Sequence, residues 1–390
     1  MKKYSAFIII GLILIVTGIV LLSNKRQGQD NPSTTVTQSE LTEKAYVAVE
    51  GEGKIAVIDT QNKVVVKRID LSSNGNMGEV SFMPHNVQVA PNGKTVWVTA
   101  NAMEEMSHAQ NSLFSIPKAY ADEGDENAMT EDEAIVIDPR TDAIIKRIPL
   151  GLGLHLSHVA LTPDSKYAIV ASQEKNLVYK INTITYAIEK QVTLAENSGP
   201  HGLRISPDGK TAYIAMLSGK NMGVLDIATL AVRYVPLNGA VVQTGVTPDG
   251  KYVVASVYDT KSLAIYSTQT KQVSYVKLPA EAKGPVQMYP TPDSKFIYLA
   301  DQGYYFNQPN SQFVYKVDMA EMKVVKEIKA GAAPHGAVVS QDGSFVYITN
   351  LLSDDVSIID TKTDSEIVRL PIGKQPNGIS LWSKQAGGTP

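Results

Sequence analysis

One repeated phrase constrains the fold of this chain more than any other feature. Four copies carry a histidine followed by a turn: Pro84-His85-Asn86 with Pro91-Asn92-Gly93, Ser157-His158-Val159 with Pro163-Asp164-Ser165, Pro200-His201-Gly202 with Pro207-Asp208-Gly209, and Pro334-His335-Gly336 with Gln341-Asp342-Gly343. Three further copies lack the histidine. Repeats of roughly 40–50 residues are typical of solenoids and propellers. Any site is therefore expected to be a ring assembled from distant residues.

Each repeat predicts four short strands. Alternating β-branched and aromatic residues between Asn, Asp and Gly turns give strands such as Thr211–Ala215, Val356–Asp360 and Ile367–Leu370. Long helical patterns are absent from this part of the sequence. The chain is expected to be all-β.

The repeats close into a ring of seven. Inner strands are expected to begin near seven residues: His85, His158, His201, Gln243, Gln287, His335 and Asn377. The last, Asn377–Trp382, lacks its other three strands, whereas Ala45–Glu50, Lys54–Asp59 and Val64–Leu71 lack an inner one. One blade built from both termini would leave no unpaired sheet edge. We therefore expect a seven-bladed β-propeller over residues 44–383, followed by a disordered tail at 384–390.

The amino end is of a different kind. Lys2-Lys3 precede an apolar run, Ser5–Ser23, and Lys25-Arg26 follow it. Such a run is close to the ~20 residues that cross a bilayer as a helix. No small-x-small cleavage site follows, which favours an uncleaved signal anchor over residues 1–26 rather than a removed signal peptide. Residues 27–43 form a polar linker. The propeller is thus expected outside the cytoplasm, anchored in the cell membrane.

Composition excludes several functions. There is no cysteine, which excludes disulfides, thiolate metal centres, iron–sulfur clusters and covalent haem attachment. Acidic residues outnumber basic ones, 39 to 36, and four of the basic residues lie at the amino end. The basic surplus of a nucleic-acid binder is missing. No nucleophile elbow, phosphate-binding Gly loop or zinc-protease signature is present.

The long loops are expected on one face of the propeller, which we call the histidine face. They are Ser72–Met83, Ala102–Asp132 and Gly303–Ser311, and they join strands at the end where the histidine phrases begin. The insertion at 102–132 carries an acidic run, interpreted as a solvated lid rather than a calcium loop. The Asp residues of the Pro-Asp-Gly turns, such as Asp208 and Asp249, are expected on the opposite face as turn formers.

The convergent side chains are the candidate site. His85, His158, His201 and His335 are the candidate metal ligands, because four imidazoles near one axis can bind a metal. Nearby methionines, including Met216, Met222 and Met288, favour copper over zinc. The structural alternative is that each Pro-His phrase only shapes the entry to a strand. The candidate ligand-binding residues on the same face are Gln243, Gln287, Tyr289, Asn377, Tyr304 and Tyr305.

The repeats resemble a known family. Pro-Asp-Gly-Lys, then Phe345–Asn350, then Val-x-Ile-Ile-Asp-x-x-Thr are similar to the YVTN family of seven-bladed propeller repeats. The resemblance covers about Ala45 to Trp382 and implies a cell-envelope protein of undefined activity. Related propellers include amine dehydrogenases and the copper domain of nitrous oxide reductase. Only the four histidines above correspond to that copper ring, and Gln243, Gln287 and Asn377 stand in the other slots.

Three functions follow as alternatives. The first is a membrane-anchored extracytoplasmic propeller that binds a small molecule or an envelope protein on the histidine face. The second is a copper-binding or redox protein that uses the histidine ring. The third is a propeller-type lactonase, which the sequence favours least because it shows no acid–histidine–arginine constellation at the channel.

Overall fold

The computed structural model describes residues 41–75, 78–103 and 130–384. The expected membrane anchor, nearly all of the linker, most of the 102–132 insertion and all but the first residue of the expected tail lie outside these ranges. The described helices are two short 3-10 turns, η2 (Glu50–Glu52) and η3 (Tyr304–Phe306), and neither has the length to span a membrane.

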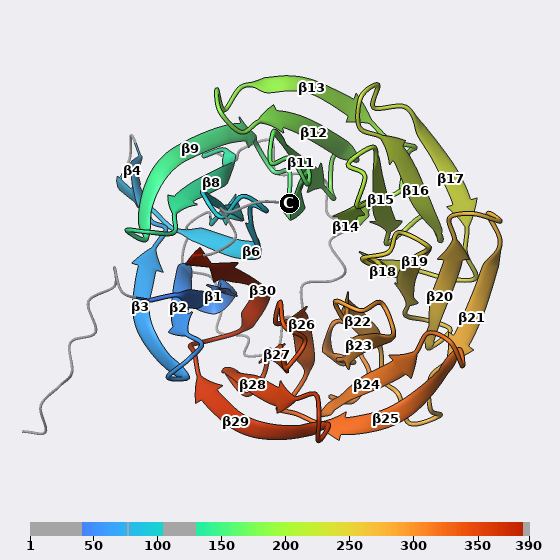
Figure 1. Ribbon diagram of the computed structural model, residues 1–390. Helices are drawn as coiled ribbons and strands as arrows, with labels where there is room; N and C mark the ends of the chain where they lie inside the picture. Colours follow the sequence, from blue (N-terminus) through green and yellow to red (C-terminus); the bar gives the residue numbers. More distant parts are fainter. Residues whose placement is uncertain (1–40, 76–77, 104–129, 385–390) are drawn as a thin grey trace, which may run out of the picture. The chain divides into compact units, whose positions relative to one another are not determined.

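The described residues from Leu41 onward form seven antiparallel sheets of four strands each, arranged as blades around a central axis (Figure 1). From the axis outward, blade 1 is β6 (Phe82–Val89), β7 (Val96–Ala102), β8 (Asp132–Asp138) and β9 (Ala143–Gly151). Blade 2 is β10 (Leu156–Leu161), β11 (Tyr167–Ser172), β12 (Leu177–Asn182) and β13 (Ile188–Thr193). Blade 3 is β14 (Pro200–Ile205), β15 (Thr211–Met216), β16 (Asn221–Asp226) and β17 (Val232–Pro236).

The ring continues in the same way. Blade 4 is β18 (Val241–Val246), β19 (Tyr252–Val257), β20 (Ser262–Ser267) and β21 (Val273–Lys277). Blade 5 is β22 (Pro285–Pro290), β23 (Phe296–Asp301), β24 (Phe313–Asp318) and β25 (Lys323–Lys329). Blade 6 is β26 (Pro334–Val339), β27 (Phe345–Asn350), β28 (Asp355–Asp360) and β29 (Ser365–Pro371).

Blade 7 is built from both ends of the described chain. Its inner strand is β30 (Pro376–Ser383), followed outward by β1 (Glu43–Val49), β2 (Lys54–Asp59) and β3 (Val64–Asp70). Strands β1 and β30 pair antiparallel, with Tyr46 opposite Ser380. The seven-bladed all-β fold and its closure by distant segments are confirmed.

Apolar side chains between neighbouring blades form the core. At the closure, Tyr46 of blade 7 packs with Phe82 of blade 1 and with Trp382. A buried ion pair joins the same blades, because the Lys44 ammonium lies 3.0 Å from the Asp142 carboxylate and donates to Pro139 O at 2.8 Å. Both faces of these strands are buried, which explains their nearly continuous apolar sequences.

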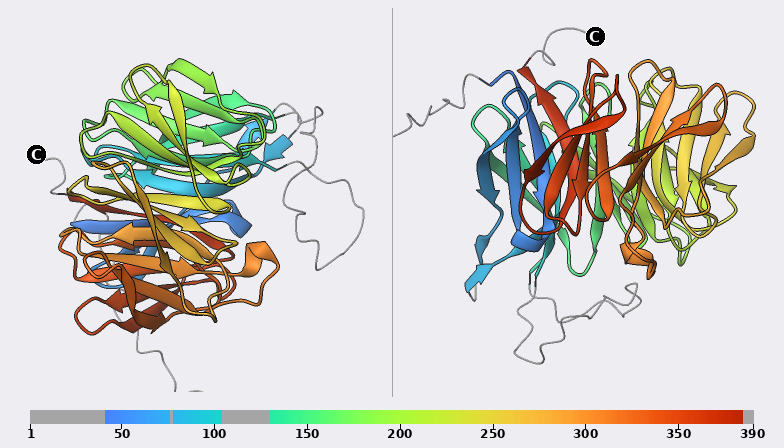
Figure 2. Two further views of the ribbon diagram at one scale, coloured as in Figure 1. Left: turned by 90° about the vertical axis from the view of Figure 1, so that its right-hand side faces the viewer. Right: turned by 90° about the horizontal axis from the view of Figure 1, so that it is seen from below.

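The two faces of the ring differ. The hairpin of β4 (Ser73–Gly75) and β5 (Gly78–Val80) and the segment with η3 project from the same face (Figure 2). They belong to two of the expected long loops, and they lie at the end where the inner strands begin. The Asp208 carboxylate accepts a bond from the Lys210 N–H within its turn at the other end, as expected.

Candidate functional site

Each inner strand is bulged where its phrase begins. In β14, Pro200 pairs with Met216 and Leu203 with Ile214, so that His201 and Gly202 lie opposite one residue. The same break in register occurs in the other inner strands. Bulges redirect side chains and are common beside active sites. They turn these polar residues toward the axis.

The bulge explains the uneven alignment of the repeats. His85, His201, His335 and Asn377 are the first of two bulge residues, whereas His158, Gln243 and Gln287 are the second. Glycine fills the second position where blades come closest. A Cβ on Gly202 would lie 1.9 Å from Gln243 Oε1, and one on Gly336 would lie 2.3 Å from Asn377 O. Pro-His-Gly is therefore also a packing motif.

Three histidines from consecutive blades form a cluster, which we call the histidine triad. His85, His158 and His201 are buried, and each offers a ring nitrogen within 4.8 Å of the nitrogens of the other two. Their ring centroids lie 5.2–5.9 Å apart. The fourth candidate metal ligand, His335, is outside the triad.

Hydrogen bonds orient two of the triad rings. His201 Nδ1 lies 2.8 Å from Val242 O, which can only accept, so Nδ1 carries the proton and Nε2 keeps a lone pair. His85 Nδ1 lies 3.3 Å from Asn377 Nδ2, which can only donate, and 3.6 Å from the Glu50 carboxylate. The two neighbours favour different tautomers of His85, because the Asn377 amide donates to Nδ1 whereas the Glu50 carboxylate attracts the ring proton to it.

The third triad member is unsatisfied. Both ring nitrogens of His158 are buried without a hydrogen-bond partner among the described residues, and so is His85 Nε2. An unsatisfied buried polar group costs about 1–3 kcal/mol. A metal ion that accepts these lone pairs would remove part of that cost.

Burial keeps His158 and His201 neutral. Desolvation, followed by the nearby His85 charge, lowers the pKa of His201 to about 3. Desolvation also lowers the pKa of His158 well below its usual range, with the His201 charge adding to the effect. Burial alone would raise the pKa of Glu50, but the His85 and Asn377 hydrogen bonds outweigh it and keep the group anionic. The neutral imidazoles of His158 and His201 are suited to a cation.

His335 differs from the triad in its partners. Gln302 Oε1 accepts from the Tyr305 N–H at 3.3 Å, so the amide nitrogen of Gln302 faces His335 Nδ1 at 2.7 Å and donates to it. The ring proton of neutral His335 is then on Nε2, which lacks a partner. His335 therefore presents a donor toward the axis, and the Tyr305 ring packs edge-on against it at 5.6 Å.

The other polar slots also carry unsatisfied atoms. The amide nitrogens of Gln243 and Gln287 and the amide oxygen of Asn377 are buried without partners in the described part of the chain. Gln243 Oε1 accepts from the Thr244 N–H at 2.9 Å, and Asn377 Nδ2 donates to Glu50 at 2.7 Å. These bonds leave the Gln243 amide nitrogen free to donate and the Asn377 amide oxygen free to accept a hydrogen bond from a ligand.

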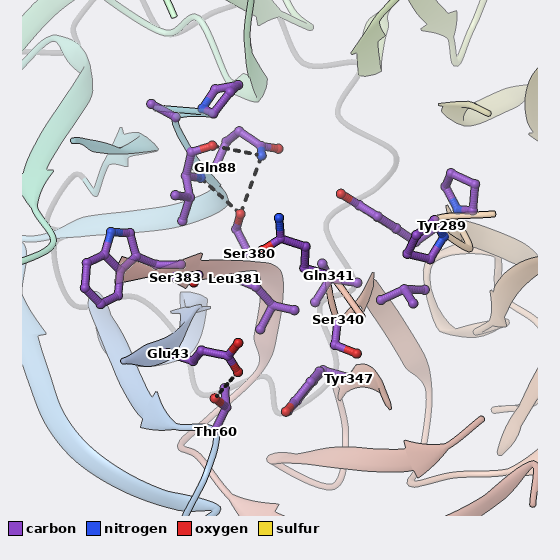
Figure 3. Close-up of a pocket in the computed structure, with 18 of the residues that line it drawn as sticks. Glu43, Thr60, Gln88, Tyr289, Ser340, Gln341, Tyr347, Ser380, Leu381 and Ser383 are labelled. Carbon is purple, nitrogen blue, oxygen red and sulfur yellow. Dashed lines mark hydrogen bonds between the residues drawn. The ribbon is translucent and has the colours of Figure 1, made fainter. Parts of the chain in front are cut away.

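Tyr289 lies apart from this ring. It sits near the end of β22, where it lines a cavity of about 420 Å³ at the opposite mouth of the channel (Figure 3). Its neighbours there include Gln88, Ser380 and Tyr347. Tyr304 and Tyr305 lie in η3 on the histidine face, so the structure divides the candidate ligand-binding residues between two mouths.

The methionines that the structure places in the core are packing residues and not candidate metal ligands. Met216, Met222 and Met288 each pack in a hydrophobic cluster between blades. Met106 and Met129 lie outside the described residues. The choice between copper and zinc therefore rests on the imidazoles.

Two residues of the site, Glu50 and His155, were not predicted from the sequence. Glu50 gave no signal, because it reaches His85 only through the closure of blade 7. His155 is the second: its ring centroid lies 5.7 Å from that of His85. The backbone of His155 itself is in the left-handed region, at φ 47°. Asp132 holds it there, accepting from the His155 N–H at 3.0 Å. The sequence signal that could have indicated His155 is its position three residues before His158, at the entrance to the same inner strand.

Solved structures share the fold at low identity. Hydrazine synthase of Kuenenia stuttgartiensis is 18% identical with a TM-score of 0.61, covering 76% of this chain and 89% of that one. Virginiamycin B lyase from Staphylococcus aureus is 15% identical with a TM-score of 0.57, covering 76% and 87%. A functionally unknown protein from Desulfotomaculum acetoxidans is 12% identical with a TM-score of 0.66, covering 87% and 99%. At these identities the likeness concerns the fold alone.

The comparison with protein families identifies the chain more specifically than the comparison with solved structures. No curated protein matches the chain. The family described as YNCE-like beta-propeller matches residues 125–386, which is more than half of the sequence. This match agrees with the seven-bladed YVTN-type resemblance of the repeats. The chain belongs to the YNCE-like β-propeller family.

Proposed function

We propose that this propeller binds a transition-metal ion through the histidine triad, with Glu50 as the carboxylate that orients His85. The observation that supports this most strongly is the convergence of three buried imidazole nitrogens within 4.8 Å of one another. Three histidines with an open position are a common catalytic zinc arrangement, and imidazole also suits copper.

Copper(II) should bind more tightly than zinc, since affinities of nitrogen sites follow the Irving–Williams order. Two features favour a cation: His158 and His201 are neutral, and Glu50 supplies a negative charge beside His85. The Arg204 charge, which helps to lower the pKa of His158, acts against it. A metal held there would face the channel mouth, where it could meet a small molecule.

The test is a calorimetric titration of chelator-treated protein with copper(II) and zinc. One ion per chain should bind, and His158→Gln should abolish tight binding because it removes one of three ligands. His335→Gln is the matched control, since the same change is made in the same ring outside the triad. Equal binding by the wild type and His158→Gln would refute the site.

Glu50→Gln tests the positioning role. It keeps the shape and the bond from Asn377 but removes the charge beside His85 Nδ1. Loss of such a partner typically weakens metal binding by about 10–100-fold. An unchanged affinity would show that Glu50 has no part in the site.

The cellular location is part of the proposal. The apolar run Ser5–Ser23, its basic flanks and the polar linker support a membrane anchor with the propeller outside the cytoplasm. In that setting the histidine face would meet ions and small molecules of the cell envelope.

A further inference from the structure

The seven polar slots around the axis divide into two chemical halves. Four consecutive inner strands, β30, β6, β10 and β14, carry Asn377 and the histidine triad, which offer an amide oxygen and ring lone pairs. The next three, β18, β22 and β26, carry Gln243, Gln287 and His335. These three offer N–H groups that are buried and have no acceptor among the described residues.

Hydrogen bonds to neighbouring residues show that Gln243 and His335 each present an N–H donor. Gln243 Oε1 is taken by the Thr244 N–H, which leaves its amide nitrogen facing the channel. Gln302 donates to His335 Nδ1, which leaves the His335 proton on Nε2. Buried donors are normally satisfied, so several in one place call for an acceptor from outside the chain.

A cation lies on β14, the inner strand next to β18. Arg204 occupies the slot on β14 that Gln88, Tyr289 and Ser380 occupy on their strands, and those three line the channel cavity. Among the described residues, Arg204 is hydrogen-bonded to its own neighbour, because Nη1 donates to Leu203 O at 2.9 Å. No described carboxylate lies within 4.0 Å of the guanidinium. Burial lowers the pKa of Arg204, as expected for a guanidinium without a counter-ion.

Small residues flank this arginine. The corresponding slots in blades 2 and 4 hold Ala160 and Gly245. Among the described residues, Glu50 is the carboxylate that contacts the ring histidines, and it lies in the other half, beside His85. The donor half thus has unsatisfied N–H groups, and Arg204 supplies a positive charge from the adjacent strand β14.

We propose that the donor half of the ring binds a small carboxylate, held by Gln243, Gln287 and His335 and attracted by Arg204. Charge-assisted hydrogen bonds to a carboxylate are stronger than neutral ones, and an unpaired guanidinium gains most from such a ligand. This site goes beyond the proposed metal site, since it uses other residues and requires no metal.

The test uses ¹³C-formate as the probe on metal-free protein, with line broadening of the formate signal as the readout. The wild type should broaden the signal saturably, and unlabelled acetate should reverse it. Gln243→Glu keeps the oxygen that accepts from Thr244 but places a negative charge in the ring. It should weaken formate binding at least about tenfold, as should Arg204→Gln.

Gln191→Glu, the same change on the exposed outer strand β13, is the matched control and should leave binding intact. Should Gln243→Glu fail to fold, Gln287→Glu takes its place. No saturable broadening by the wild type, or equal broadening by all variants, would overturn the proposal. His158→Gln should still bind formate, so a failure of the metal site would be seen separately.

Discussion

At the scale of single residues, burial decides the chemistry of the ring. An imidazole in water titrates near pH 6.5, but the ring histidines are desolvated and packed beside one another. Burial first, and then the His85 charge, lowers the pKa of His335 to about 3. His335 therefore stays neutral in the folded protein at pH values where the unfolded chain takes up protons.

The sign of the pH effect follows from this difference. A histidine whose pKa is lowered by folding stabilises the protein above pH 6.5, and that contribution falls as the pH drops toward 3. For His335 the loss between pH 7 and pH 5 should be about 2 kcal/mol, at about 1.4 kcal/mol per pKa unit. Urea unfolding of chelator-treated His335→Gln should show that much less pH dependence than the wild type. An equal slope for both would contradict the buried neutral state.

The candidate metal ligands could be predicted from the sequence only in part. The repeat placed His85, His158 and His201 at equivalent strand entrances, and the structure brings them together. It also placed His335 there, but the Gln302 bond that turns His335 into a donor connects separate strands and leaves no sequence pattern. Glu50 escaped prediction for a similar reason, since its contact with His85 depends on ring closure.

At the scale of elements, the strand pattern was predictable and the bulges were not. Alternation of apolar residues and Asn, Asp and Gly turns is local, so the four strands of each blade could be predicted from sequence. A bulge depends on pairing with the neighbouring strand, which a single strand's sequence does not record. The bulges nevertheless determine which side chains reach the axis.

Strand β30 carries the closure, so its removal should be severe. A chain ending before Pro376 would expose the edge of β1 and remove Trp382, whose indole donates to Gly93 O at 2.8 Å. Unpaired edges promote aggregation, and we expect an aggregating or strongly destabilised product. A chain ending after Lys384 is the control. If both melt cooperatively at the same temperature in calorimetry, closure by β30 is not needed for the fold.

At the scale of the whole molecule, the long loops on one face and the tight turns on the other suggest how the propeller is used. The proposed location outside the membrane would leave the histidine face accessible to solutes. Protease added to intact spheroplasts should digest or release the propeller, because the polar linker would be exposed. Protection until the membrane is lysed would place the domain in the cytoplasm.

In the proposed site, three imidazoles from consecutive blades hold one metal ion. The most direct measurement is anomalous diffraction at the zinc and copper absorption edges, from crystals of the propeller grown with each metal. We expect one strong peak about 2.0–2.1 Å from a ring nitrogen of each of His85, His158 and His201. A metal bound only elsewhere, or no peak at the triad with either metal, would contradict it.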